Sequence, residues 1–403
     1  MKRILFVDDE PLVLQGLQRM LRPMRQEWEM EFVDGGAKAL ALMEGNDFDV
    51  VVSDMRMPGM NGAELLGRVM QQHPKTVRIV LSGHADKELI LKCVGSTHQF
   101  LSKPCDPEAL KSTMRRASAA ATAFQSEILK SLVGQMNRLP SIPSLYNEII
   151  EALQDPEVPL DIVGEIIGKD MAMTAQILKL VNSAFFGLRR QISSSAEAAT
   201  YLGLDTLRAL VLSINVFSQY ESIQVAGFSF SSLWAHSLDT ARAAKRVALA
   251  ASGDRKMADE AFVSGLLHDA GKLVLVANFA EQYAEVLGLV RTAGLDQCSA
   301  EQRIFGVNHA DVGGYLLGLW GLPVPVVEAI AFHHRPGDAG EKEIGPLAAV
   351  HIGNAFAHDL ASDGSASLET WLDVNYLTAL GVVERLPAWR EDFERETTIP
   401  QAA

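Results

Sequence analysis

The stretch VVVSDMRMPGMNGAELL, residues 50–66, decides the fold of the N-terminal part of the chain. It joins a short apolar run to a segment with the apolar spacing of a helix. The same alternation occurs four more times in the first 120 residues. The apolar runs are 4–7, 30–33, 48–52, 77–81 and 99–101, and the helix-period segments are 12–21, 37–43, 63–70, 87–94 and 108 onward. Five βα units of this length predict a parallel sheet covered by helices on both faces.

Charged and hydroxyl side chains stand at the ends of these apolar runs. Asp8 and Asp9 follow the first run, Asp54 the third, Ser82 the fourth and Lys103 the fifth. Because sites in such sheets form at the carboxyl ends of the strands, we expect these side chains to converge. Clustered carboxylates repel each other unless a hard divalent cation such as Mg²⁺ shares the charge. A carboxylate nucleophile, a metal, a hydroxyl and an ammonium in one pocket meet the needs of phosphoryl transfer to aspartate.

Four motifs in this order, FVDDEP at 6–11, VVSDMRMPGMNG at 51–62, LSGHAD at 81–86 and FLSKP at 100–104, carry a family resemblance. Residues 1–120 resemble the receiver domain of two-component response regulators. The resemblance implies a flavodoxin-like, doubly wound five-stranded fold. It also implies a sensor histidine kinase or a phosphotransfer protein as the phosphoryl donor. The alternative is a domain of this fold whose acidic loops are only solvated.

The same resemblance implies a role for each motif residue. Asp54 would be the phosphorylated residue, and Asp8 and Asp9 would bind Mg²⁺ together with Asp54 and the backbone carbonyl of Arg56. Ser82 and Lys103 would hold the phosphoryl group. Phe100 occupies the aromatic switch position, where the family more often has Tyr. Phosphate would pull Ser82 inward and let Phe100 follow, so the outer face near the fourth and fifth units would change shape.

Composition restricts the function of the rest of the chain. The 403 residues include 36 Lys and Arg against 50 Asp and Glu, a formal net charge of −14. Residues 1–120 hold 16 basic and 16 acidic side chains, so the whole excess lies beyond them. We therefore expect no direct nucleic-acid partner. Three scattered cysteines predict neither a disulfide framework nor a zinc site, and no apolar stretch reaches the length of a membrane span, so we expect a cytoplasmic protein without a membrane partner.

A connecting helix is predicted over residues 107–137. Its apolar residues recur with a period of 3.5. They are Leu110, Met114, Ala117, Ala121, Phe124 and Ile128. The first part packs on the receiver sheet. Beyond residue 117 the same seam suits either a homodimer coiled coil or a packing surface on the second domain, and the spacing leaves both open.

Residues 138–350 are almost entirely of helical period, which predicts an all-α domain. The segment GLLHDAGKL, 265–273, carries His268 and Asp269, and one helix through it would place Lys272 on the side of both. Further imidazoles lie at His236, His309, His333, His334 and His351. Imidazoles with one carboxylate form a ligand set for Fe, Mn or Zn, and a metal-bound hydroxide attacks phosphodiesters. The alternative is a buried hydrogen-bonded network that only fixes the packing.

Three segments with the His268–Asp269 pair carry a second resemblance. They are LPSIPSLYNEII at 139–150, GKDMAMTAQILKLVNSAFFG at 168–187 and AATYLGLDTLRALVLSINVF at 198–217. They resemble the HDOD domain, a relative of the HD and HD-GYP phosphohydrolases. The resemblance implies an output or scaffold module, a family in which catalysis is not generally demonstrated.

The chain departs from the catalytic relatives at three points. The position of their last ligand Asp is held by Asn354, and no Gly-Tyr-Pro triplet follows HHRP at 333–336. Neighbouring helical residues point about 100° apart, so we expect His333 and His334 not to bind one metal together. The resemblance thus implies a vestigial metal site with Lys272 as a supporting residue. Its members are His236, His268, Asp269, His309, His333, His334 and Asn354.

Residues 351–403 are expected to close the helical domain and to end in a frayed tail. The sequence as a whole predicts a response regulator that accepts a phosphoryl group on Asp54 and signals through a non-catalytic helical domain to a downstream protein. The alternative is a receiver-regulated, metal-dependent phosphodiesterase acting on cyclic di-GMP or another nucleotide.

Overall fold

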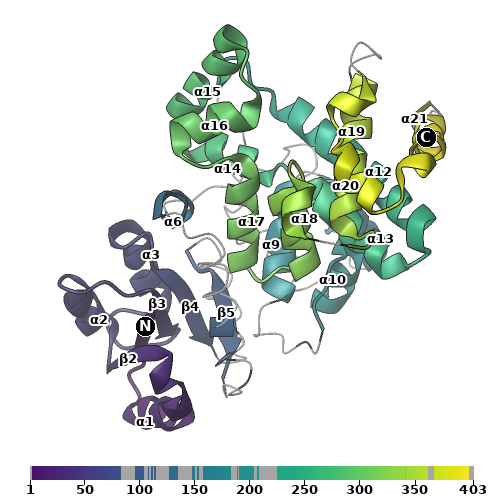
Figure 1. Ribbon diagram of the computed structural model, residues 1–403. Helices are drawn as coiled ribbons and strands as arrows, with labels where there is room; N and C mark the ends of the chain where they lie inside the picture. The colour runs from purple at the N-terminus through teal and green to yellow at the C-terminus, as the bar shows by residue number, and fades with distance from the viewer. Residues whose placement is uncertain are drawn as a thin grey trace.

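The computed structural model of the chain separates into an α/β region and a helical region (Figure 1). It describes residues 2–82, 96–103, 127–134, 158–182, 190–203, 225–340, 342–361 and 367–398. It also describes the shorter pieces 108, 110–111, 113–114, 148–149, 152–153, 188 and 207. The expected helix at 87–94 and most of the connecting helix lie outside these residues.

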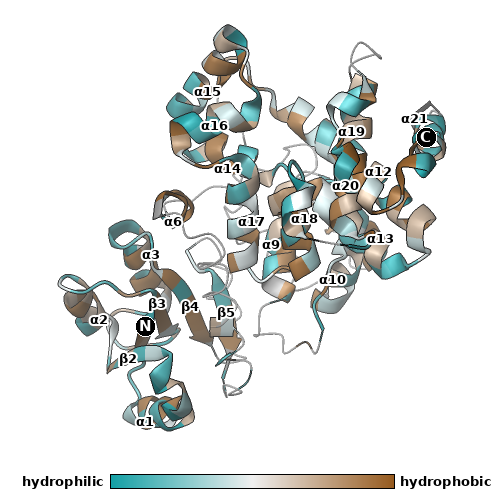
Figure 2. Ribbon diagram, in the orientation of Figure 1, coloured by the Kyte–Doolittle hydropathy of each residue, from teal (hydrophilic) through white to brown (hydrophobic). Residues whose placement is uncertain are grey.

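A five-stranded sheet forms the N-terminal region, as predicted. Its strands are β1 (Lys2–Val7), β2 (Trp28–Val33), β3 (Val50–Asp54), β4 (Val77–Ser82) and β5 (Gln99–Ser102). All neighbours pair in parallel, in the order β2-β1-β3-β4-β5. This is the flavodoxin-like order. Figure 2 shows β4 in brown, and every residue of that strand is buried, as expected for a parallel strand covered on both faces.

Helices α1 (Pro11–Met20), α2 (Gly36–Met43) and α3 (Gly62–Gln72) connect the strands, with a 3₁₀ turn, η1 (Arg22–Gln26), before β2. Asn61 caps α3, because its side-chain oxygen accepts the backbone N–H of Glu64 at 2.9 Å. Gly62 is required at the first position of α3, since a Cβ there would lie 2.1 Å from the carbonyl oxygen of Asp54. This close approach sets the start of α3 directly against the end of β3.

The C-terminal region is helical, as predicted. Its first helices are α8 (Leu160–Ile167), α9 (Met171–Val181) and α10 (Ser195–Leu202). The next are α12 (Phe230–Ser252), α13 (Arg255–Leu267), α14 (Ala270–Asn278), α15 (Ala280–Ala293), α16 (Gln297–Phe305), α17 (His309–Leu319) and α18 (Val324–Phe332). The last are α19 (Pro346–Ala361), α20 (Val374–Ala379) and α21 (Leu386–Thr398), with 3₁₀ turns η4 (Pro336–Ala339), η5 (Leu368–Thr370) and η6 (Val383–Arg385).

Helix α19 crosses residue 350, where the sequence suggested a boundary. It packs along α12 and also contacts α13 and α18. Gly353 permits this packing, because a Cβ there would lie 2.8 Å from the backbone nitrogen of Ala244. The residues after 350 therefore share the apolar core of α12 and α13, and Phe356, Trp389 and Phe393 are buried in it.

The described end of the connecting helix, α6 (Glu127–Gly134), lies between the two regions (Figure 1). It contacts α17, and a Cβ on its last residue, Gly134, would lie 1.7 Å from the carbonyl oxygen of Pro74. Leu129 and Val133 are buried, whereas Ile128 is 51% exposed. The face of α6 that packs within the chain is thus that of Leu129 and Val133, whereas the seam residue Ile128 is the exposed one, and homodimerisation stays a prediction.

Among the described residues, no single helix is both long and apolar enough to cross a bilayer. The segment Arg255–Asn278 taken together with Ala280–Ala293 reaches that length and composition, but the pair is bent by 119° at the break.

Candidate functional site

Two buried clusters of polar residues stand out, one in each region. The first lies at the carboxyl edge of the sheet. The ammonium of Lys103, directly after β5, lies 2.7 Å from Oδ2 of Asp8 and 2.5 Å from Oδ1 of Asp54. Asp8, Asp54 and Ser82 are buried. The sequence predicted this convergence from strand ends alone, and the parallel register produces it.

Backbone groups complete the environment of these carboxylates. Oδ1 of Asp8 accepts the N–H of Glu10, and Oδ2 of Asp54 accepts the N–H of Arg56, both at 2.9 Å. Burial raises the pKa of Asp54, against the opposing effect of Lys103. Burial alone would lower the pKa of Lys103, but its bonds to Asp54 and Asp8 outweigh burial and raise it. The pocket therefore concentrates negative charge and holds one ammonium against it.

Oxygen donors in this pocket fit a hard divalent cation. Asp8 and Asp54 present buried carboxylates, and Asp9 beside them is half-buried. Lys103 carries the compensating charge between the first two. Oxygen-only donors of this kind are the ligands that Mg²⁺ prefers.

Strand β5 connects this pocket to the helical region. Gln99, its first residue, donates from Nε2 to the carbonyl oxygen of Leu319 at the end of α17, at 2.6 Å. Phe100, the next residue, is fully buried, and Nζ of Lys179 on α9 lies 6.0 Å from its ring centre. The same ammonium lies 4.5 Å from the ring centre of Trp320. One short strand thus touches the helical region at its start and the carboxylates at its end.

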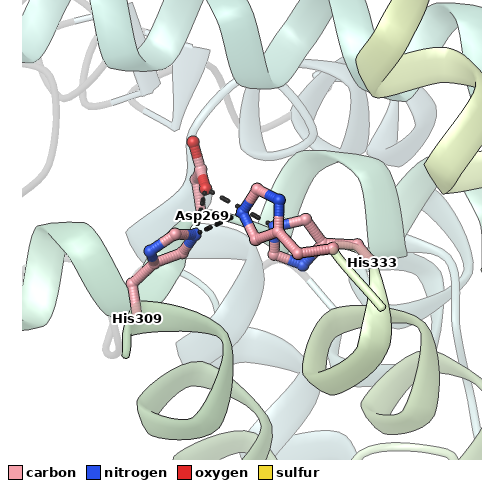
Figure 3. A group of neighbouring side chains, drawn as sticks. Asp269, His309 and His333 are labelled. Carbon is pink, nitrogen blue, oxygen red and sulfur yellow. Dashed lines mark hydrogen bonds and ion pairs between the residues drawn. The ribbon is translucent and has the colours of Figure 1, made fainter. Parts of the chain in front are cut away.

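The second cluster lies inside the helical region around Asp269 (Figure 3). Oδ1 of Asp269 is 3.2 Å from Nε2 of His309 and 3.9 Å from Nε2 of His333. Its other oxygen, Oδ2, is 3.5 Å from Nε2 of His268 and 2.7 Å from Nζ of Lys272. The carboxylate and the three imidazoles are buried. Four of the residues that the sequence singled out therefore meet around one carboxylate.

The sequence suggested that one helix runs through His268 and Asp269, but the structure has two helices there. Helix α13 ends at Leu267 and α14 begins at Ala270, so the two residues stand at a helix junction. Gly271 explains the junction, because a Cβ there would lie 1.9 Å from the carbonyl oxygen of His309. This contact draws the start of α14 onto α17 and brings Asp269 to His309. The expected pairing of Lys272 with Asp269 is present.

Backbone carbonyls fix the tautomers of two imidazoles. Nδ1 of His268 lies 2.7 Å from the carbonyl oxygen of Gly265, and Nδ1 of His333 lies 2.7 Å from that of Ile330. A carbonyl only accepts, so each Nδ1 carries the proton and each neutral ring presents an Nε2 lone pair. Burial lowers the pKa of His268 to about 3, and burial also lowers that of His333. Neither Nε2 finds a hydrogen-bond partner among the described residues.

The expectation that His333 and His334 point apart is wrong. The two residues directly follow the end of α18 at Phe332, and their ring centres lie 4.0 Å apart. Nε2 of His334 lies 3.0 Å from Nε2 of His309. Ligand atoms of Asp269, His309, His333 and His334 all lie within 4.8 Å of one another.

His236 and Asn354 extend the cluster around Asp269. His236, His268 and Asp269 form a second group whose ligand atoms lie within 4.8 Å. Asn354 is buried on α19. The ring of His358, which the sequence reasoning did not single out, lies 4.4 Å from that of His236. His351 lies apart, with Nδ1 2.8 Å from the carbonyl oxygen of His333 and Nε2 accepting the N–H of Asp373.

The donor set fits a transition metal. Two buried Nε2 atoms, which have no hydrogen-bond partner in the part of the chain that the structure describes, lie near the carboxylate of Asp269, and imidazole with carboxylate suits Zn, Fe or Mn. Burial alone would raise the pKa of Asp269, but the ammonium of Lys272, 2.7 Å from its Oδ2, opposes burial and the pKa lies well below the usual range. The carboxylate is thus held ionised inside the protein.

Sequence reasoning missed Glu301, which is fully buried on α16. Its Oε2 lies 2.6 Å from Nδ1 of His309 and accepts the backbone N–H of His309 at 2.7 Å. Its Oε1 accepts the hydroxyl of Tyr283 at 3.1 Å. No spacing signal marked Glu301, because it lies eight residues before His309 on a different helix.

Models of known protein families match both regions of the chain. The model of the response regulator receiver domain matches residues 4–115, and that of the HDOD domain matches residues 139–336. An uncharacterised protein of Treponema pallidum is 28% identical over 217 residues, which cover 54% of this chain and 42% of that protein. A cyclic di-GMP phosphodiesterase of Thermotoga maritima is 26% identical over 132 residues, covering 32% of this chain and 35% of that protein. The chain thus spans less than half the length of either curated relative.

Among solved structures, the MmoQ response regulator of Methylococcus capsulatus is similar over 60% of this chain and 98% of its own, with 24% identity and a TM-score of 0.47. The identification itself rests on the two domain matches, which cover the sheet and most of the helical region in the order expected from the motifs. The chain therefore belongs to the response regulators, with an N-terminal receiver domain followed by an HDOD domain.

Proposed function

We propose that Asp54 accepts a phosphoryl group from a sensor histidine kinase or a phosphotransfer protein, and that the HDOD domain responds to it. The observation that carries this proposal is the position of β5. Lys103 at its end pairs with Asp8 and Asp54, while Gln99 and Phe100 at its start contact the HDOD domain. The backbone of β5 thus connects the carboxylate pocket to the contact between the domains over a few residues.

The chemistry assigned to this pocket is simple. A carboxylate oxygen of Asp54 attacks phosphorus, an O–P bond forms, and the N–P bond to the donor imidazole breaks. Asp8, Asp9 and the backbone carbonyl of Arg56 would hold Mg²⁺, which neutralises charge on the phosphoryl oxygens. Lys103 already lies 2.5 Å from the accepting carboxylate and is placed to pair with the transferred group.

Phosphorylation would be transmitted through Ser82 and Phe100. The phosphoryl group adds a charge of about −1.5 to −2 and acceptor oxygens, which attract the hydroxyl of Ser82 at the end of β4. Strands β4 and β5 pair here, with Ser82 opposite Ser102 and Val80 opposite Phe100. A displacement of the β4 end therefore reaches Phe100 and its contact with Lys179, which biases the arrangement of the two domains.

The HDOD output is proposed to be binding of a downstream protein rather than catalysis. Lys272 lies 2.7 Å from Oδ2 of Asp269, so an ammonium already compensates the one central carboxylate. Asn354 adds a neutral amide where a second carboxylate would be needed. Both features favour a hydrogen-bonded network that stabilises the packing, rather than an open catalytic metal site.

The phosphorylation step is tested with acetyl phosphate and Mg²⁺. The wild-type chain should gain one phosphoryl group, measured by intact-mass spectrometry, and Asp54→Asn should gain none. Asp47→Asn is a matched control in the same domain. Asp47 lies before the start of β3, away from the carboxyl ends of the strands, so this variant should be labelled like the wild type. Equal labelling of wild type and Asp54→Asn would refute the assignment.

A second candidate function is a metal-dependent phosphodiesterase acting on cyclic di-GMP or another nucleotide. The observation in its favour is the convergence of His309, His333 and His334 on Asp269. Such a site, when loaded with metal, supplies a hydroxide nucleophile. Asp269 and the imidazole Nε2 atoms would hold the metal, and Lys272 would face the incoming phosphate.

This candidate is tested by cyclic di-GMP hydrolysis after loading with Mn²⁺, Fe²⁺ or Zn²⁺. Turnover that disappears in a His268→Ala, Asp269→Ala double variant would replace the binding function by catalysis. Absence of turnover with stoichiometric metal would leave a structural metal site.

Homodimerisation through the connecting helix is proposed as an accompanying feature. The exposure of Ile128 on α6 leaves an apolar side chain for a second copy. Light scattering that gives a monomer mass with and without acetyl phosphate would reject it.

A further inference from the structure

We infer that Glu301 is the positioning residue of the HDOD metal cluster, holding His309 so that its Nε2 points at the metal. This inference rests on the second candidate function, because it concerns the residues that would bind the ion. Glu301 is not itself a ligand in this arrangement. Its Oε2 lies on the far side of the imidazole, 2.6 Å from Nδ1.

Hydrogen bonds hold both carboxylate oxygens of Glu301 in place. Oε2 accepts the ring Nδ1–H and the backbone N–H of His309, at 2.6 and 2.7 Å. Oε1 accepts the hydroxyl of Tyr283, and that hydroxyl in turn accepts Nε2 of Gln297 at 2.6 Å. Glu301, Tyr283 and His309 are all fully buried. The carboxylate therefore cannot turn away without leaving several buried groups unpaired.

The tautomer of His309 follows from this contact. A carboxylate oxygen accepts, so Nδ1 of His309 donates and the ring faces Asp269 with Nε2, at 3.2 Å. The same Nε2 lies 3.0 Å from Nε2 of His334. The imidazoles of His268 and His333 are oriented by neutral backbone carbonyls, whereas His309 is oriented by a carboxylate. His309 is thus the most strongly donating of the three.

Electrostatics assigns a second effect to Glu301. Its carboxylate places negative charge behind the imidazole in a buried region, which favours a cation on the opposite side of the ring. Outer carboxylates that hold metal-binding histidines typically contribute about 10- to 100-fold to metal affinity. We therefore assign an effect of this size to Glu301 through His309, without direct contact to the ion.

The test measures metal affinity of the full-length chain after removal of bound metal with a chelator. Co²⁺ is titrated and followed by visible absorption, and Zn²⁺ serves as competitor. Wild type should bind Co²⁺, and Glu301→Gln should bind it about 10- to 100-fold more weakly. Glu260→Gln is the matched control, since Glu260 is also buried in this domain but pairs with Lys256. It should bind like the wild type.

A tautomer measurement separates positioning from a general structural effect. In wild type without metal, ¹⁵N spectra should show Nδ1 of His309 protonated and strongly hydrogen-bonded to a carboxylate, and in Glu301→Gln the signal of that nitrogen should shift to that of a weaker hydrogen bond. If Glu301→Gln does not fold, Tyr283→Phe replaces it. That variant removes one donor to Glu301, and its Co²⁺ affinity should fall by a factor of about 3, a hydrogen bond of roughly 0.6 kcal/mol.

Each outcome decides the inference. Equal Co²⁺ affinity of wild type and the Glu301 or Tyr283 variant would overturn it and leave the metal site itself intact. Failure of wild type to bind Co²⁺ would overturn both this inference and the second candidate function.

Discussion

The ammonium of Lys179 on α9 lies 6.0 Å from the ring centre of Phe100 on β5 and 4.5 Å from that of Trp320. Lys179 is only 1% exposed. A buried cation between two aromatic rings, one from each domain, links the aromatic switch position of the receiver to the HDOD domain. Cation–π contacts of this kind contribute about 0.5–2 kcal/mol.

Replacing Lys179 by Met should weaken the contact between the domains. Met fills a similar volume but carries no charge, so the cation–π contacts are lost, and the unphosphorylated chain should open more often. An effect of about 1.4 kcal/mol corresponds to a tenfold change in the ratio of closed to open forms. Small-angle scattering should show a larger radius of gyration than in wild type. Lys169→Met removes a half-exposed lysine of the same domain and should leave the radius unchanged.

Replacing Lys103 by Met should destabilise the receiver in the absence of Mg²⁺. Two buried carboxylates, Asp8 and Asp54, then lose their compensating charge, which costs about 3–5 kcal/mol. Mg²⁺ should recover part of that loss, so it should raise the melting temperature more in Lys103→Met than in wild type. Scanning fluorimetry with and without Mg²⁺ measures both shifts.

The control for this experiment is Lys38→Met. Lys38 forms an exposed pair with Asp34, which is worth less than about 1 kcal/mol. An identical Mg²⁺-induced shift in wild type and Lys103→Met would contradict the assigned role of Lys103.

His98 should make the stability of the receiver depend on pH. Burial first, and then Arg78 and Lys179, lowers the pKa of His98 well below 6.5. Nδ1 of the ring accepts the backbone N–H of Arg78 at 3.0 Å, which requires the neutral ring. Below about pH 6.5 the unfolded chain binds a proton that the folded chain does not, so stability falls as pH falls, by up to about 1.4 kcal/mol per pH unit.

Urea unfolding of wild type and His98→Asn between pH 5 and 8 measures this contribution. Asn keeps an acceptor for Arg78 but does not titrate. The difference in unfolding free energy should change between pH 5 and 6.5 and stay constant from pH 7 to 8. A constant difference over the whole range would show that His98 does not titrate on unfolding.

Gly271→Ala should disrupt the junction that brings Asp269 to His309. The added methyl would lie 1.9 Å from a backbone oxygen, which cannot move as a side chain does, so α14 and α17 must separate. We expect a loss of more than about 3 kcal/mol in unfolding free energy. Gly288→Ala is the matched control on α15, where the Cβ meets no atom within 4 Å, and should be neutral or stabilising by up to about 1 kcal/mol. Thermal unfolding that ranks both variants alike would contradict the packing argument.

The sequence by itself determined the receiver domain and its acidic pocket. Asp8, Asp54 and Ser82 follow apolar runs whose period identifies parallel strands, and the carboxyl ends of such strands meet at one edge. Local pattern therefore sufficed to bring those residues together. The HDOD region was likewise recognised as helical, and Asp269 with its histidines was singled out from residue type.

Tertiary structure alone decided how the helical cluster is assembled. The pairing of Glu301 with His309, the contact of His334 with His309, and the contact of Lys179 with Phe100 join residues that lie far apart in helical period or in separate domains. Helical period fixes which face of a helix is apolar, but not where the helix ends or how closely it approaches its neighbour. Those depend on packing, as at Gly271, where the absence of a side chain sets the distance between two helices.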